Sequence, residues 1–93
     1  MRRKARVDAN HAEITSALRS CGWTVVDTSR LGSGFPDLLA ARGGRIELIE
    51  VKDGAKVPSA RALTRAELDM YDQLITAGVR IRYIDAVEQV AAL

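Results

Sequence analysis

The sequence predicts a single α/β domain in which helices flank a mixed four-stranded sheet, with elements in the order αβββαβα. Three observations support this prediction: 93 residues suffice for one hydrophobic core, a diglycine separates two strand-like runs, and a helical stretch separates the last two strands. The first three strands have short connections and are expected to be antiparallel, whereas the crossover helix makes the fourth strand parallel to the third. The domain is expected to span 1–93, with residues 1–7 as a basic N-terminal arm.

The first half of the chain predicts one helix and one strand before the diglycine. A helix is expected over residues 9–20, with Asp8 or Asn10 as the candidate for its N-cap. Residues 23–27 are β-branched and aromatic, which is typical of a strand. The loop over 30–36 holds two glycines and a proline, so no regular element is expected there. The apolar side chains that recur at helical spacing are Ile14, Ala17, Leu18 and Cys21.

The second half predicts a hairpin, a helix, a strand and a short terminal helix. Paired glycines accept the positive φ that a two-residue hairpin turn requires, so Gly43 and Gly44 should join the second and third strands. Thr64 should cap the next helix, with Glu67 placed as in a capping box. Asp85 is expected to cap the terminal helix. The predicted ranges are 38–42 and 45–52 for the hairpin strands, 64–78 for the helix, 79–84 for the last strand and 85–93 for the terminal helix with its cap.

The composition excludes several kinds of site and protein. One cysteine rules out an intrachain disulfide, and a single histidine, His11, leaves catalytic triads and multi-histidine zinc sites unsupported. We expect His11 to be exposed on its helix and Trp23 to lie in the core or at a dimer contact. No apolar run suggests a membrane span or a signal peptide, so an intracellular protein is expected.

Basic residues gather in two stretches, although the formal net charge is only +2. Basic patches of this kind suit a polyanion such as DNA, while the alternative is a solvated tail and a solvated loop. The residues that would hold DNA phosphates are Arg2, Arg3, Lys4 and Arg6 in the first stretch and Lys56, Arg61 and Arg65 in the second.

The diglycine turn also predicts a pair of opposed carboxylates. Continued along both strands, its register pairs Asp37 with Glu50 and separates their Cβ atoms by ~5 Å. Lys52 lies on the same face, two residues along. Like charges on a largely apolar face are destabilising, unless a hard cation such as Mg²⁺ or Mn²⁺ lies between them. The alternative is a structural salt bridge between Lys52 and either acid.

Two segments resemble the halves of the PD-(D/E)XK nuclease signature, namely Gly34-Phe35-Pro36-Asp37 and Ile49-Glu50-Val51-Lys52. The order of the elements over nearly the whole chain resembles the VRR-NUC branch of these nucleases, which includes phage-type proteins and is related to Holliday-junction resolvases. The resemblance implies a restriction-endonuclease-like core and an endonuclease that uses Mg²⁺ or Mn²⁺. Both the resemblance and the small size favour a homodimer that acts on DNA, including branched DNA. A chain of 93 residues without a reading module is expected to recognise the structure of DNA rather than its sequence, in the cytoplasm of a bacterium or a phage-infected cell.

By position, the resemblance implies roles for individual residues. Asp37 and Glu50 would ligate the metal, the backbone carbonyl of Val51 would add a ligand, and Lys52 would be the catalytic lysine. Glu13 would match the acid that the family carries on its first helix and uses at the metal. A solvated helix residue is the alternative for Glu13.

Two further positions lie near this signature. Glu67 stands where VRR-NUC proteins usually carry glutamine, so it would contact the metal shell or serve only in the capping box. Ser33 lies in a glycine-rich loop that we interpret as the approach of DNA to Asp37. The added acid at Glu67 favours a second hypothesis, a non-catalytic DNA-binding domain that keeps the nuclease fold. A third is a dimeric structural or regulatory subunit in which the charged cluster is only a salt-bridge network.

Overall fold

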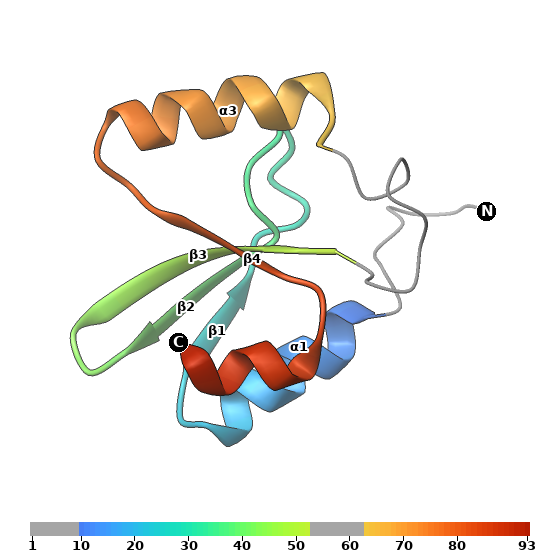
Figure 1. The fold of residues 1–93 in the computed structure, drawn as a ribbon, viewed down its shortest axis with the longest axis vertical. Helices are drawn as coiled ribbons and strands as arrows, with labels where there is room; N and C mark the ends of the chain where they lie inside the picture. The colour runs from blue at the N-terminus through green and yellow to red at the C-terminus, as the bar shows by residue number, and fades with distance from the viewer. Residues whose placement is uncertain (1–9, 53–62) are drawn as a thin grey trace.

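The computed structural model describes residues 10–52 and 63–93, so the predicted basic arm and the loop over 53–62 lie outside the described residues. Figure 1 shows one twisted sheet with α3 on one face and with α1 and η1 on the other. This arrangement confirms the predicted α/β class and element order. The elements are α1 (Asn10–Ser20), β1 (Thr24–Asp27), β2 (Leu38–Arg42), β3 (Arg45–Val51), α3 (Arg65–Thr76), β4 (Ile81–Ile84) and the 3₁₀ helix η1 (Val87–Ala92).

The sheet has the predicted mixed topology and register. Its strand order is β1-β2-β3-β4, with β2 antiparallel to both β1 and β3 and with β3 parallel to β4. The hairpin pairs Arg42 with Arg45 and Leu38 with Ile49, as the diglycine turn requires. Both turn glycines have positive φ, 57° at Gly43 and 83° at Gly44, which matches the right-handed twist of the flanking strands.

Strand periodicity divides the core between the two faces of the sheet. Ile49 and Val51 belong to the larger cluster beneath α1 and η1, whereas Leu48 packs with Tyr71 of α3. Trp23 is 3% exposed and belongs to the larger cluster, which confirms its place in the core. Within residues 10–52 and 63–93, no helix has the length and apolar character that a membrane span needs.

The start of α3 follows the sequence signal closely. The Thr64 side chain accepts a hydrogen bond from the Glu67 N–H, and the Glu67 side chain accepts one from the Thr64 N–H, so the predicted capping box is present. The helix is shorter than expected and ends at Thr76, after which Gly78 has a φ of 93°. The capping box holds the Glu67 carboxylate at the first turn, over the sheet.

Asn10 and Asp85 are not the caps that the sequence predicts, and Asp8, the other candidate for the first cap, lies outside the described residues. Asn10 lies within α1, and its amide Nδ2 donates to the carbonyls of Lys52 and Asp85, both at 2.8 Å. Asp85 does not cap η1, because the N-cap is Ala86 and has no side-chain hydrogen bond; Asp85 instead exchanges two hydrogen bonds with Gln89. Asn10 therefore ties the start of α1 to the chain just after β3 and β4.

The exposure of two side chains is the reverse of what we expected. His11 is only 8% exposed, because it lies three residues before Ile14 and seven before Leu18, on the buried face of α1. Cys21 is exposed, because α1 ends at Ser20 and the chain turns away before the apolar stripe reaches Cys21.

The loop before β2 packs directly against the start of α3. A Cβ atom at Gly34 would lie 2.2 Å from the Ala66 carbonyl oxygen, so no larger residue fits without moving backbone. Gly32 has the same positive φ, 77° against 78° at Gly34, but a Cβ there would meet nothing within 4 Å. Both glycines therefore need a positive φ, but only Gly34 also needs the space that a missing side chain leaves.

We predict that Gly34→Ala destabilises the protein far more than Gly32→Ala. The strain of a positive φ should cost both variants about 1–2 kcal/mol in the free energy of unfolding. Gly34→Ala adds the clash with α3 and should lose more than about 3 kcal/mol in total. Urea denaturation of the two variants measures the difference, and equal losses would contradict the observed packing of the loop.

Candidate active site

Backbone contacts fix Asp37 at the entry to β2. The Val51 N–H donates to Asp37 Oδ2 at 3.0 Å, which extends the hairpin pairing one step beyond Leu38 and Ile49. On the other side, the Thr28 N–H donates to the Asp37 carbonyl at 2.8 Å. The carboxylate therefore fills the end of the β2–β3 ladder, beside Glu50, as the register predicts.

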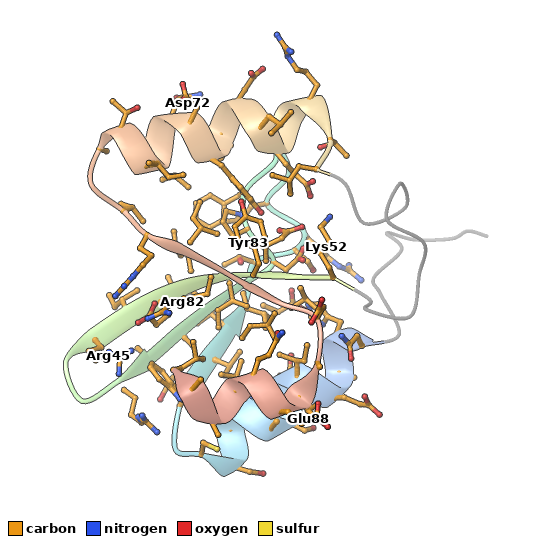
Figure 2. The ribbon with its side chains drawn as sticks, viewed as in Figure 1. Arg45, Lys52, Asp72, Arg82, Tyr83 and Glu88 are labelled. Atoms are coloured by element: carbon orange, nitrogen blue, oxygen red, sulfur yellow. The ribbon has the colours of Figure 1, made fainter. Side chains whose placement is uncertain are left out.

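Glu50 is a buried carboxylate on the α3 face of the sheet. It is 1% exposed, and the Tyr71 hydroxyl donates a hydrogen bond to its Oε1. Its Oε2 lies 3.1 Å from Lys52 Nζ. The Tyr71 ring is in turn held edge-on against Tyr83, with centroids 6.0 Å apart. Figure 2 shows Lys52 and Tyr83 in the layer between the sheet and α3.

Lys52 lies between two glutamates. Besides Glu50, its Nζ is 3.6 Å from Oε1 of Glu67, the acid that the capping box holds in place. The salt bridge that we weighed as the alternative to a metal site is therefore present between Lys52 and Glu50. It does not neutralise the site, because one ammonium faces Glu50, Glu67 and the nearby Asp37.

The electrostatics of the site follow from burial. Burial raises the pKa of Glu50 to about 7; the Tyr71 hydrogen bond opposes this rise, and the charge of Asp37 adds to it. Burial also raises the pKa of Asp37, against the opposing effects of the Val51 N–H and of His11. Burial alone would lower the pKa of Lys52, but its bond to Glu50 raises it, so the ammonium stays charged.

Glu47, three residues earlier on β3, provides an internal comparison. It is also buried, at 4% exposed, and its carboxylate bonds Arg45 at 2.6 Å and Arg82 at 3.2 Å. Burial favours a higher pKa for Glu47, but the two arginine hydrogen bonds lower it below its usual value. Two arginines thus offset the cost of burying the charge of Glu47. Glu50 has no such pair of arginines, and its pKa is raised.

The structure gathers some of the predicted site residues and leaves others apart. Asp37, Glu50, Lys52 and Glu67 lie together, whereas Glu13 is exposed and lines a hollow with Ser16 and Val87 between α1 and η1. The structure therefore does not bring Glu13 to the acid pair. The reason is rotational, because Glu13 precedes the buried Ile14 and projects away from the sheet.

Of the predicted phosphate-binding residues, the structure describes only Ser33 and Arg65. Ser33 is exposed and has a φ of 57°, while the Arg65 side chain is 87% exposed and pairs with Asp69 at 3.6 Å. The side chain of Val51 lies in the core beneath α1, and its N–H is the group that bonds Asp37. The remaining basic residues lie outside the described residues: Arg2, Arg3, Lys4, Arg6, Lys56 and Arg61.

Sequence reasoning missed Tyr71 as a residue of the site. Tyr71 follows Glu67 by four residues, so both side chains lie on one face of α3. Because the sequence already predicts Glu67 near the metal, the spacing of four residues could have indicated that Tyr71 lies there too. Its partner Glu50 lies 21 residues away in sequence, and only the docking of α3 reveals the contact.

The donor set suits a hard divalent cation. Within the described ranges, no group of three or more His, Cys, Asp and Glu side chains is arranged to hold a metal. Mg²⁺, however, commonly takes only one or two protein carboxylates and completes its shell with water and phosphate oxygens. Asp37 and Glu50 are two adjacent carboxylates whose repulsion such a cation would relieve, so these residues fit it.

The fold described above is also found in a solved structure. In a comparison with solved structures, the chain is similar to a structure described as a VRR_NUC domain, with a TM-score of 0.66 and 24% sequence identity. The match covers 92% of this chain and 95% of that chain, so the two share their fold over nearly their whole length. No family model and no curated protein matches the sequence.

We predict that the metal-free protein loses stability as the pH rises from 5 to 8. The folded state binds the Glu50 proton more tightly than the unfolded state does. The stability gained from this proton is therefore complete below the unfolded pKa of 4.5 and is lost as the pH rises through the folded pKa of about 7. The loss should be on the order of 2–3 kcal/mol. Urea denaturation in chelator measures it, and Glu50→Gln should flatten the profile; a profile that Glu50→Gln leaves unchanged would contradict this origin.

We also predict that Tyr71→Phe is costly while Tyr83→Phe is not. Both changes remove one hydroxyl, but only that of Tyr71 is bonded to the buried Glu50. At pH 8, Tyr71→Phe should lower the free energy of unfolding by about 1–3 kcal/mol. Tyr83 is 51% exposed, so its variant should stay within about 0.5 kcal/mol of the wild type. Similar effects of the two variants would mean that the hydroxyl bond contributes little.

Proposed function

We propose that this protein is a divalent-metal-dependent DNA endonuclease. The observation that carries the proposal is the buried Glu50 beside the half-buried Asp37, with Lys52 Nζ at 3.1 Å from Glu50 Oε2. Strongly perturbed carboxylates with a specific charged partner are typical of functional sites. The similarity in fold to a VRR_NUC domain agrees with the same reaction class.

In this proposal, Asp37 and Glu50 would hold Mg²⁺ or Mn²⁺, and the Val51 carbonyl would add a further ligand. The cation would supply Lewis-acid stabilisation of the scissile phosphate and a more acidic water. Hydrolysis bonds the water oxygen to phosphorus, breaks the bond to the 3′ oxygen and leaves a proton on that oxygen. Lys52 stabilises the negative charge that develops on the phosphate, because its ammonium is kept charged and in place by Glu50 and Glu67.

The two basic stretches would hold the DNA backbone without reading its bases. Contacts to phosphates carry no sequence information, so we propose recognition of DNA structure, including branched DNA, rather than sequence. A homodimer would place two such sites against two strands. We propose that it acts in the cytoplasm of a bacterium or a phage-infected cell.

A second candidate is a DNA-binding domain without catalysis. The observation that favours it is the position of Lys52, which is engaged by Glu50 and Glu67 at the same time. A lysine held by two acids is less free to contact a phosphate than one held by a single acid. This candidate requires DNA binding that no chelator changes.

We predict that the purified protein cuts linear or branched DNA in Mg²⁺ or Mn²⁺ and that chelator stops the reaction. Asp37→Asn and Lys52→Met should each lower the cleavage rate by about 10²–10³-fold. Asp72→Asn is the matched control, because Asp72 is exposed on the outer side of α3 (Figure 2) and should leave the rate unchanged. Gel assays of substrate cleavage measure the rates.

The outcome also separates the two candidates. Equal cutting by Asp37→Asn and wild type would remove the endonuclease proposal, since the activity would then come from elsewhere. DNA binding that persists in chelator, with no cleavage in any divalent cation, would establish the second candidate instead.

A further inference from the structure

His11 is a buried polar side chain that lacks a partner. The residue is 8% exposed, and its Nε2 is the buried side-chain nitrogen or oxygen atom that has no hydrogen bond within the described part of the chain. A buried polar atom without a partner costs free energy that an apolar side chain of similar size avoids. Such an atom needs an explanation, and His11 is not used by the mechanism above.

The position of His11 places this atom at the same end of the sheet as Asp37, on the α1 side. Its Nε2 lies 3.9 Å from Asp27 Oδ1, and Asp27 pairs with Leu38, the residue directly after Asp37. The next residue, Thr28, donates its N–H to the Asp37 carbonyl. The imidazole also acts electrostatically on Asp37, where it opposes the effect of burial on the pKa. His11 is therefore, like Asn10, a residue of α1 that the fold brings to this end of the sheet.

Asp27 does not satisfy His11. The separation of 3.9 Å is too long for a hydrogen bond. Asp27 Oδ1 already accepts hydrogen bonds from the N–H and the hydroxyl of Ser29, at 2.9 and 2.6 Å, and the Asp27 side chain is 58% exposed. His11 Nε2 is therefore free to form a hydrogen bond with a ligand, or with a water molecule that the ligand carries.

We propose that His11 is the contribution of α1 to the active site: its Nε2 binds a water molecule of the hydrated cation at the Asp37 end and so fixes the cation's position. This inference rests on the proposed metal-dependent function. It assigns His11 as a positioning residue that acts through water, which agrees with the absence of a three-ligand cluster among the described residues. It also gives α1 a role that Glu13 cannot fill from its exposed position.

The first test separates function from stability by means of His11→Leu. Leucine removes the unpartnered nitrogen, so the melting temperature should stay equal to that of the wild type or rise. Calorimetric titration with Mn²⁺ alone should nevertheless show a roughly tenfold loss of affinity. His11→Gln, which restores a polar group, should recover part of that affinity, and Asp27→Asn should leave it within about twofold of the wild type.

The second test uses the fact that the chain has one histidine. Its imidazole ¹⁵N resonances therefore belong to His11 without further assignment. Addition of diamagnetic Mg²⁺ should shift the Nε2 resonance in the wild type, because the nitrogen gains a hydrogen-bond partner. The shift should be absent in Asp37→Asn. A histidine that only supports the fold would not respond to the cation.

The possible results distinguish this inference from the proposed function. If Mn²⁺ binding depends on Asp37 while His11→Leu binds as tightly as the wild type, the inference is overturned and the metal site stands. A lower melting temperature of His11→Leu with unchanged affinity would overturn it in favour of a structural pairing with Asp27. If Asp37→Asn binds Mn²⁺ as the wild type does, the proposed function fails, and the role of His11 fails with it.

Discussion

The burial of an incompletely compensated carboxylate at Glu50 is the constraint that organises one face of this protein. Water is replaced around Glu50 by a tyrosine hydroxyl and a lysine ammonium, which come from α3 and from the end of β3. Tyr71 can donate to Glu50 only if α3 lies across the sheet at this point. The position of α3 is therefore set by a polar contact as well as by the apolar residues around Leu48. A change at this contact alters the charge of the site and the docking of the helix together.

The frame around the charged groups is built from backbone hydrogen bonds. Asp37 is held through the Val51 N–H, its own carbonyl is held by Thr28, and the Lys52 carbonyl is held by the amide of Asn10. These contacts do not depend on the ionisation of Glu50 or Lys52. The site thus combines a fixed backbone with a few side chains whose charges are unbalanced, which is the arrangement that preorganised catalysis requires.

The sequence was sufficient for the sheet and for its acid pair, because both follow from short-range rules. A two-residue turn at Gly43 and Gly44 fixes the register, and the register alone brings Asp37 to Glu50. The rotation of α1 also has a local signal, because His11 lies three residues before Ile14 and seven before Leu18, although a polar histidine is expected to be exposed. His11 and Glu13 are separated by about 200° around a helix axis, so only one of them can face the sheet. Periodicity does not reveal the hydrogen bonds of Asn10 to carbonyls 42 and 75 residues away in sequence, which attach the start of α1 to the sheet.

The charges of the site bear on the choice between catalysis and simple DNA binding. When all are ionised, Asp37, Glu50 and Glu67 carry three negative charges against the one positive charge of Lys52. A phosphate that approached this group directly would be repelled, so the site is a poor docking point for a DNA-binding domain that uses no cation. Glu47 shows that the same strand can neutralise a buried glutamate with two arginines. A pair of arginines could neutralise Glu50 in the same way, but Glu50 has only Lys52 as a positively charged neighbour among the described residues. A divalent cation would supply the missing positive charge and attract the phosphate at the same time, and this requirement supports the proposed endonuclease over the proposed DNA-binding domain.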